Sequence, residues 1–312
     1  MTKIICGVDV CKSRLDAAVS SPRVFASFAN DAGGIAALAG FCRTHGVELA
    51  VMEATGGFER KAFLLLWQEG VASALVNPRN VRCFAEAMGA MEKTDPIDAA
   101  MIARFAIAKD IKPMEPPSTA QQRMKALVAR LRQVTDDLTV QKQRRSAAAD
   151  DETLASIDEV IALLKRQSKK LEGEIASMID DDPLWAKLAE TFRSIKGVAG
   201  RTVARLMADL PEIGVFDNKA VSKLVGLAPL ADDSGRRSGQ RHIRGGRASV
   251  RSILFLVAEI ARRYDDGLAD LHRRLTEAGK KKMVIRVAFA HKLLVRLNAK
   301  ARDARAEFAN AT

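Results

Sequence analysis

With 312 residues, of which 48% are hydrophobic and 28% charged, the chain is long enough for two or three folded domains and is not disordered in composition. Its net charge is +12, and residues 183–312 carry 26 basic and 13 acidic side chains, so the excess is C-terminal. This excess predicts a polyanionic partner. Nucleic acid is favoured over a membrane surface, because no apolar run is long enough for a spanning helix and the N-terminus lacks a signal pattern.

The first 112 residues predict an α/β domain. An apolar, β-branched run at 3–10 and two short runs at 14–21 and 24–30 predict three antiparallel strands. A helix at 31–46 follows, and strands and helices then alternate: strands at 47–57 and 71–78, helices at 58–70, 79–89 and 95–108. This is the order of a ribonuclease-H-like domain, in which the first strand lies centrally beside a parallel strand that follows the first helix.

Residues 113–182 predict a linker and a helical coiled-coil arm. Pro113, Pro116 and Pro117 cannot continue a helix and mark the linker. Apolar residues then recur at three- and four-residue steps on both sides of a polar break, which predicts two long antiparallel helices. The arm serves either as a dimerisation coil or as a hairpin packed on its own domain, and the apolar stripe is equally consistent with both.

Residues 183–312 predict a basic, mainly α-helical C-terminal domain. Gly197 and Gly200 lie in a short turn between two helical patterns, which resembles a helix-hairpin-helix whose backbone N–H groups could approach a phosphate. An ordinary helix connection explains the same turn at least as well.

The four cysteines show no CxxC spacing and all lie in the first third of the chain: Cys6, Cys11, Cys42 and Cys83. We expect reduced core thiols in a cytoplasmic protein. The four scattered histidines do not complete a zinc-type ligand pattern with them.

The stretch EKTDPIDA places Asp95 and Asp98 three residues apart across Pro96. Asp95 could cap a helix that begins at Pro96, with Asp98 at its third position, and taken alone the pattern favours this capping role. Alternatively, the two carboxylates project from one face of the helix start and hold a divalent cation.

Two further carboxylates favour the metal interpretation. Asp9 lies in the apolar first strand, where a carboxylate is costly to bury unless it is paired or bound to a cation, and Glu53 ends the strand predicted to lie beside it. Four converging carboxylates would repel one another, and two divalent cations about 4 Å apart would relieve this repulsion. Such a pair suits phosphodiester chemistry, with Mg²⁺, or Mn²⁺ in its place, as the expected ion.

These residues fall in stretches that resemble the DEDD transposases of insertion sequence family one-ten, relatives of the Piv-type DNA invertases: GVDVCKSRLDAAV, MEATGGFERKAFLLL, LVNPRNVRCFAEAMGAMEKTDPIDAAMIARFA and LVGLAPLADDSGRRSGQRHIRGGRASVRSILFLVA. The resemblance covers nearly the whole chain, and the four acids, NPR and GLAP…DSG…GG appear in order. It implies that Asp9, Glu53, Asp95 and Asp98 form the acid tetrad of a RuvC-like domain that holds Mg²⁺.

The resemblance also implies that Ser234, in the C-terminal transposase domain, is the nucleophile, and that a noncoding RNA encoded by the element guides exchange between donor and target DNA. It implies a recombinase of the bacterial cytoplasm, associated with the nucleoid. We expect a homo-oligomer, a dimer or tetramer, whose subunits share composite sites.

The residues around Ser234 leave its role open. Five arginines lie near it in sequence and could neutralise a developing phosphate charge or bind nucleic acid: Arg236, Arg237, Arg241, Arg244 and Arg247. Without the resemblance, a Gly/Arg loop that grips the phosphate backbone is the favoured interpretation, with Ser234 only a turn residue. Ser238 is the second candidate nucleophile.

Two alternative functions follow from the same residues. A RuvC-like, junction-resolving endonuclease would use only the four acids and water. A non-catalytic nucleic-acid binding protein would bind in a salt-sensitive way and form no metal-dependent product.

Overall fold

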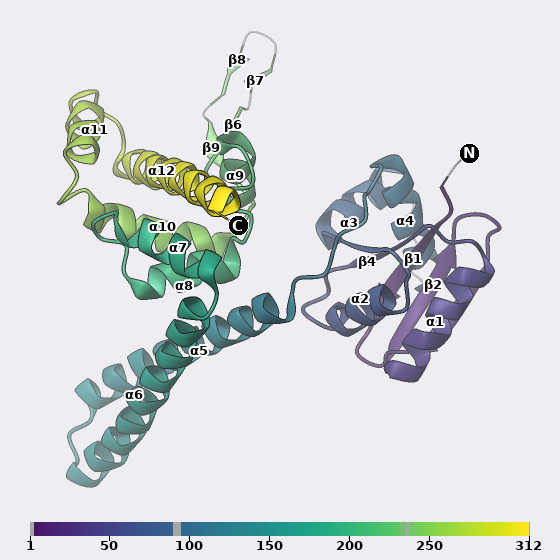
Figure 1. The fold of residues 1–312 in the computed structure, drawn as a ribbon, viewed down its shortest axis with the longest axis horizontal. Helices are drawn as coiled ribbons and strands as arrows, with labels where there is room; N and C mark the ends of the chain where they lie inside the picture. The colour runs from purple at the N-terminus through teal and green to yellow at the C-terminus, as the bar shows by residue number, and fades with distance from the viewer. Residues whose placement is uncertain (1–2, 90–94, 232, 235–236, 240, 312) are drawn as a thin grey trace. The chain divides into compact units, whose positions relative to one another are not determined.

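The computed structural model describes residues 3–89, 95–231, 233–234, 237–239 and 241–311, and the chain divides into two units, Met1–Pro117 and Ser118–Thr312. Each unit has its own core (Figure 1). In the described residues, no helix combines the length and apolar character needed to cross a membrane.

The first unit is built on a five-stranded sheet in the order β3-β2-β1-β4-β5. Its strands are β1 (Ile5–Val10), β2 (Arg14–Val19), β3 (Phe25–Ala29), β4 (Leu49–Glu53) and β5 (Ser73–Val76). The first three form an antiparallel meander, and β1, β4 and β5 are parallel. The predicted element order and the central place of the first strand are confirmed.

Helices cover both faces of this sheet. The helices are α1 (Ala32–Thr44), α2 (Glu59–Gln68), α3 (Pro78–Ala87) and α4 (Asp95–Ala108). Alternate residues of β1 divide between the two layers, because successive strand side chains point to opposite faces. Cys6 and Val8 pack with α1 and α2, whereas Ile5 packs with α3 and α4. Asp31 accepts a hydrogen bond from the Gly34 N–H, which fixes the start of α1 close to the predicted start at residue 31.

The second unit is helical, with two small two-stranded sheets. Its elements are α5 (Thr119–Ala147), α6 (Asp151–Asp180), α7 (Pro183–Arg193), α8 (Gly200–Asp209), α9 (Asn218–Val225), β6 (Pro229–Leu230), β7 (Asp233–Ser234), β8 (Arg237–Ser238), β9 (His242–Ile243), α10 (Ala248–Ala261), α11 (Asp266–Glu277) and α12 (Lys282–Ala311). The core gathers around α12, in which Leu293, Leu294 and Leu297 are completely buried. The short strands were not predicted.

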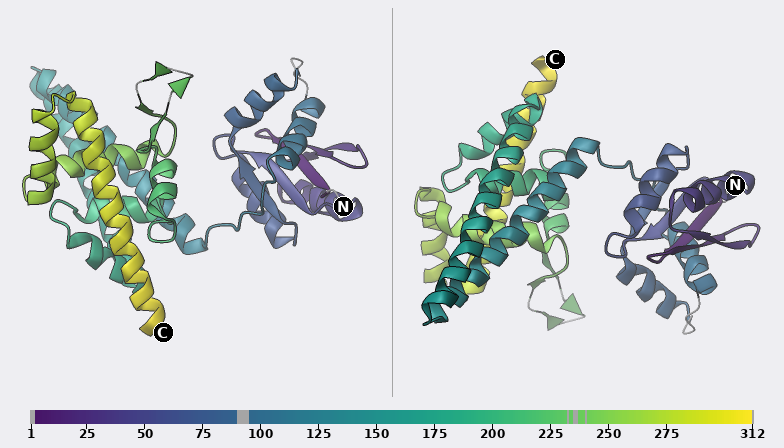
Figure 2. Two further views of the ribbon diagram at one scale, coloured as in Figure 1. Left: turned by 90° about the horizontal axis from the view of Figure 1, so that it is seen from above. Right: turned by 90° about the horizontal axis from the view of Figure 1, so that it is seen from below.

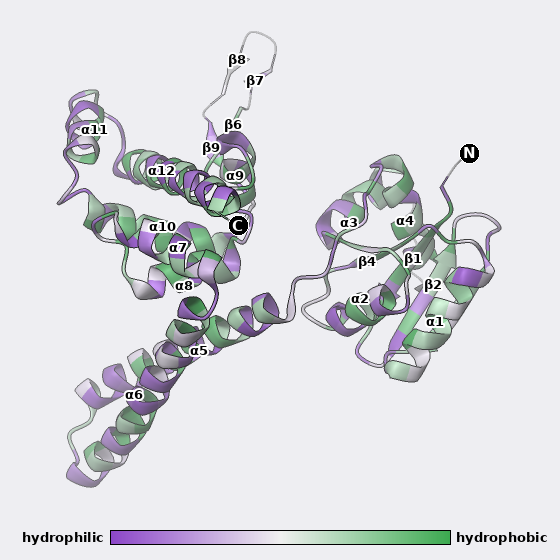
Figure 3. Cartoon of the chain, in the orientation of Figure 1, coloured by the Kyte–Doolittle hydropathy of each residue, from purple (hydrophilic) through white to green (hydrophobic). Residues whose placement is uncertain are grey.

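Helices α5 and α6 lie side by side as the predicted antiparallel pair, and hydrophobic and hydrophilic residues alternate along both (Figures 2 and 3). Their bases join the core of the second unit through Met124, Val128 and Ile179. The hairpin is therefore packed, at its base, on its own unit. Dimerisation through the arm stays a prediction, and so does a separate domain boundary at residue 182.

The prediction of four core thiols is half wrong. Cys6 and Cys42 are buried between the sheet and α1, but Cys11 and Cys83 are exposed. Cys11 follows the end of β1 in a loop, and Cys83 lies on the solvent side of α3, which buries only Val81. The apolar character of the surrounding sequence does not distinguish the buried cysteines from the exposed ones.

Candidate active site

Asp9 and Glu53 are neighbours at the carboxyl ends of two parallel strands. The register of β1 and β4 pairs Val8 with Met52, and Asp9 and Glu53 are the next residues on their strands. Both side chains are half-buried. Asp9 shares its face with Gly7, and Glu53 shares its face with Val51, so both carboxylates belong to the face that α3 and α4 cover.

Gly7 brings α4 against this face. A Cβ atom at Gly7 would lie 2.0 Å from the Ala99 carbonyl oxygen and 2.6 Å from the Ala103 nitrogen. The backbone of α4 therefore crosses β1 at a distance that only glycine allows. Asp98, half-buried and next to Ala99, is carried on the turn of α4 that touches β1 two residues from Asp9.

The Gly7 contact gives a prediction about both stability and activity. Gly7→Ala is expected to push α4 away from β1, to lower the free energy of unfolding by about 1–3 kcal/mol and to reduce activity, because Asp98 moves with the helix. Urea unfolding of the full chain measures the first effect. Gly40→Ala on α1 is the matched control, since its Cβ would meet nothing within 4 Å. Unchanged stability of Gly7→Ala would contradict the packing described.

Two polar side chains hold the loops that follow the acidic strand ends. The Asn30 amide donates to the Cys11 carbonyl at 2.8 Å and to the Phe58 carbonyl at 3.3 Å, which ties the loop after β1 to the loop after β4. Glu59 is 5% exposed, and its Oε2 accepts the N–H groups of Thr55 at 3.1 Å and Gly57 at 2.8 Å. These contacts fix the backbone next to Asp9 and Glu53, and sequence analysis missed them.

A fifth carboxylate, Asp16, faces Asp9 across the antiparallel pair β1 and β2. It is 1% exposed, and its oxygens accept hydrogen bonds from Arg14 Nε at 2.7 Å and Ser27 Oγ at 2.5 Å. A buried carboxylate is stable when its charge is compensated in this way. Asp16 is therefore engaged by protein groups and is not a strand-end ligand.

The carboxylates present suit a hard cation. Asp9, Glu53 and Asp98 supply only oxygen donors, which Mg²⁺ prefers. The α4 helix begins at Asp95, as predicted, but the side chains of Asp95 and Pro96 lie outside the described part, so the capping and ligand roles of Asp95 stay predictions. Within the residues that the structure describes, no three His, Cys, Asp or Glu side chains are grouped closely enough to hold a metal.

Ser234 is exposed on β7, in a loop that extends from α9 to α10. The register pairs Ser234 with Arg237 and Asp233 with Ser238. Asp233 accepts a hydrogen bond from the Gly239 N–H at 3.2 Å and lies 3.9 Å from Arg241. The residue Arg236 and the side chains of Arg237 and Ser238 lie outside the described part, and Arg241 and Arg244 are exposed.

The two ends of this serine loop, residues 227–245, are held together by backbone contacts. A Cβ atom at Gly246 would lie 2.3 Å from the Gly226 nitrogen, and both glycines have positive φ angles of 70° and 76°. The Arg251 guanidinium donates to the carbonyls of Val225 at 3.1 Å and Gly245 at 2.6 Å, one at each end. The base of the loop is therefore fixed to α9 and α10.

Arg247 makes further contacts at the C-terminal end of the serine loop. Its guanidinium makes a bidentate ion pair with Glu212, at 2.5 and 2.6 Å, and donates to the Asp209 carbonyl at 3.0 Å. Burial alone would raise the pKa of Glu212, but the hydrogen bonds and charge of Arg247 outweigh it and hold that pKa below its usual range. The structure thus gives Arg247 an intramolecular partner, and its contact with nucleic acid stays a prediction.

Comparisons with known proteins find transposase family models that match a region of each unit. A DEDD family model of IS110 type, described as "Transposase", matches residues 6–151, and a second, described as "Transposase IS116/IS110/IS902 family", matches residues 189–273. The chain is 24% identical over 305 residues to the pilin gene-inverting proteins of Moraxella lacunata and Moraxella bovis, with 94% of each chain covered. The first match contains all four acids, and the second contains Ser234.

Proposed function

The chain belongs to the IS110 family of transposases, and from this we propose that it cuts and rejoins DNA strands of a mobile element through a serine nucleophile assisted by a Mg²⁺-binding acid tetrad. The observation that carries this proposal is the placement of Asp9, Glu53 and Asp98 on one face of the first unit, at the ends of β1 and β4 and on the helix that touches β1. We further propose a RuvC-like identity for this unit.

In this proposal, the four carboxylates would hold the metal ion that acts on the phosphodiester. Bound Mg²⁺ would supply charge stabilisation at the phosphodiester that reacts. Asp9 and Glu53 are held by the strand register, and Asn30 and Glu59 fix the loops that follow them. Asp98 depends on α4, and Asp95 would complete the tetrad from the first residue of the same helix. Manganese would fit the same oxygen donors.

Ser234 would act by transesterification. Its hydroxyl oxygen attacks a DNA phosphorus, the phosphodiester bond to one strand end breaks, and that end leaves as a free hydroxyl after taking up a proton. The serine proton passes to an acceptor at the site. The hydroxyl of the partner strand then attacks the phosphoserine link and restores a phosphodiester, so the exchange needs no external energy source. Exposed cations of the loop, Arg241 and Arg244, would contact the strand phosphates.

Donor and target DNA are the proposed substrates, and a noncoding RNA of the element is the proposed guide. The pilin gene-inverting proteins are named for inverting a DNA segment, which is also a strand exchange. We propose a homo-oligomer as the active form, in which acids and serines of several subunits are used together on the nucleoid DNA of a bacterial cytoplasm.

The proposal is tested by purifying the protein from cells that express its whole native element and sequencing the RNA that copurifies. One discrete RNA from the noncoding flank, and exchange between donor and target DNA that stops on chelation and returns with Mg²⁺, are expected. Random or absent RNA together with cleavage of branched DNA would favour a junction-resolving endonuclease. Salt-sensitive binding without any product would favour a non-catalytic binding protein.

A further inference from the structure

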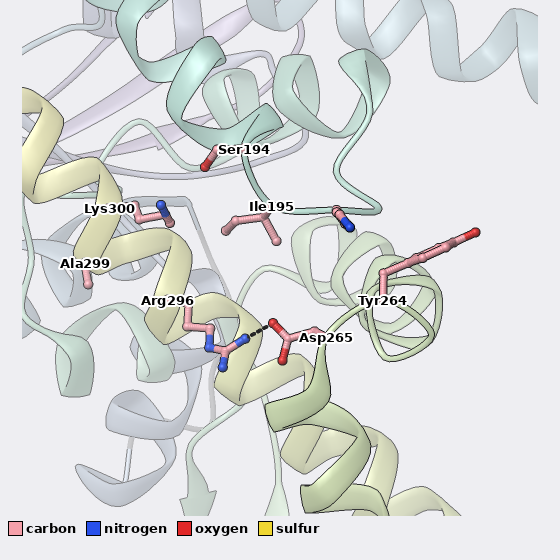
Figure 4. Close-up of a pocket in the computed structure, with 8 residues that line it drawn as sticks. Ser194, Ile195, Tyr264, Asp265, Arg296, Ala299 and Lys300 are labelled. Atoms are coloured by element: carbon pink, nitrogen blue, oxygen red, sulfur yellow. Dashed lines mark hydrogen bonds and ion pairs between the residues drawn. The ribbon is translucent and has the colours of Figure 1, made fainter.

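A cavity of about 420 Å³ lies in the second unit, away in sequence from the serine loop. It is formed by the segment after α7, the segment between α10 and α11, and α12 (Figure 4). Cavities of this size accept small molecules or single groups of a larger ligand. Neither family resemblance nor the proposed chemistry uses it.

The cavity is lined by two lysines, Lys196 and Lys300, that form no ion pair with any described residue. Arg296 also lines the cavity, but it is paired with Asp265, which caps α11 through the Leu268 N–H. The two lysines therefore give the cavity a net positive charge and favour an anionic ligand.

An aromatic ring stands at the rim. Tyr264, the only tyrosine of the chain, is 61% exposed, and Figure 4 shows its side chain directed away from Arg296, Ala299 and Lys300, with the hydroxyl outermost. A single exposed ring is ordinary on a protein surface. A ring at the edge of a cavity that two lysines also line, however, matches the combination that binds single-stranded nucleic acid, in which bases stack on aromatic faces and cations follow the phosphates.

The residues next to the cavity indicate the direction in which a bound nucleic-acid strand would continue. A second hollow shares Ser194 and Lys300 with the cavity, and it is also lined by Glu190, Asp303 and the ion pair of Lys187 with Glu307. Glu190 and Asp303 would repel phosphates, so a nucleic-acid strand is expected to leave the cavity on the Lys196 side.

We propose that this cavity binds an unpaired nucleotide of a nucleic-acid strand, with the base stacked on Tyr264 and the flanking phosphates on Lys196 and Lys300. The inference rests on the proposed function, since it names a further contact for the strands that the enzyme handles. Stacking accepts every base, and the two lysines contact phosphate, so DNA and RNA strands share this chemistry.

The test uses the full chain and two labelled probes, (dT)20 and a 20-base-pair duplex, with binding followed by fluorescence anisotropy. Tyr264→Ala is expected to weaken (dT)20 binding about tenfold and to leave duplex binding within twofold, whereas Tyr264→Phe keeps the ring and the affinity. The double variant Lys196→Gln/Lys300→Gln is expected to lower the slope of log affinity against log salt by about 1.4. Lys281→Gln is the control, because that exposed lysine precedes α12, about 28 Å along the helix from Lys300.

A second readout uses the single tyrosine. Protein labelled with 3-fluorotyrosine gives one ¹⁹F resonance, and this is expected to shift on addition of (dT)20 or (rU)20 at constant protein concentration. A shift that follows protein concentration alone would overturn the proposal and assign Tyr264, with exposed Leu256 and Ile260, to self-association. Unchanged (dT)20 and (rU)20 affinity of Tyr264→Ala would also overturn it. If strand exchange still requires Ser234, only the cavity proposal fails; if the wild-type chain neither binds nor exchanges strands, the proposed function fails as well.

Discussion

Replacing Ser234 by alanine is expected to abolish strand exchange, with a loss of roughly 10⁴-fold or more, the scale on which removal of a nucleophile acts in enzymes. The covalent protein–DNA link should disappear at the same time, because alanine has no oxygen to attack phosphorus. Folding should be intact, since Ser234 is exposed and the base of its loop is held by Arg247 and Arg251. Product formation and denaturing gels of the trapped adduct measure both effects.

Two variants sharpen this experiment. Ser252→Ala is the matched control, because that exposed hydroxyl only bonds the Ala248 carbonyl of its own helix at 2.9 Å. Ser238→Ala tests the second candidate nucleophile in the same loop. If Ser234→Ala still cleaves DNA and Ser238→Ala does not, the nucleophile is Ser238. If both cleave, water is the attacking group and the acids act as a nuclease.

Asp98→Asn is expected to lower activity by more than about a hundredfold, with little change in the free energy of unfolding. Loss of groups that merely orient a metal ligand costs about 10–100-fold, so loss of a ligand should cost more. Asparagine is nearly isosteric, and in the first turn of α4 its missing charge costs only the interaction with the helix dipole, about 0.3–1 kcal/mol. The substitution therefore separates the two roles considered for this acid: a structural residue would be replaced without loss, and a ligand would not.

The readout for Asp98→Asn is activity over a range of Mg²⁺ concentrations, and the expected half-saturating concentration is higher than in the wild type. Asp110→Asn is the matched control, because Asp110 is an exposed acid of the same unit that pairs with Lys112. Its positive φ of 47° is also one that asparagine tolerates. Full activity of Asp98→Asn at ordinary Mg²⁺ would rule out a ligand role for this residue.

The sequence predicts the sheet well because its signals are local. Apolar runs and the helix start at Asp31 set most strands and helices, and the position of the first strand follows from their order, whereas Pro78, predicted to end a strand, begins α3. The neighbourhood of Asp9 and Glu53 could be predicted for the same reason: Asp9 lies near the end of the first strand, Glu53 ends its strand, and the two strands are parallel and adjacent. The role of Gly7 could not be predicted, because the close approach of two elements produces no periodic pattern in the sequence.

The parts that could not be predicted depend on contacts distant in sequence. Asn30 reaches Phe58 across 28 residues, and Arg247 reaches Glu212 across 35. Counting arginines around Ser234 cannot reveal that Arg247 makes a bidentate ion pair with Glu212, whereas Arg241, 3.9 Å from Asp233, and Arg244 are exposed. The strands of the serine loop are two residues long, too short for any alternation to be visible.

Because the two ends of the serine loop are fixed to α9 and α10, the positions that the Ser234 side chain can reach are limited. Ser234 is eight residues from Gly226, and a fully extended chain of eight residues spans at most about 29 Å. In the proposed mechanism, every phosphate that the Ser234 hydroxyl attacks therefore lies within that radius of the α9–α10 junction. For DNA bound on the same unit, this short tether would give the proposed attack an effective concentration on the order of millimolar. Lengthening the loop would dilute the nucleophile rather than extend its useful range.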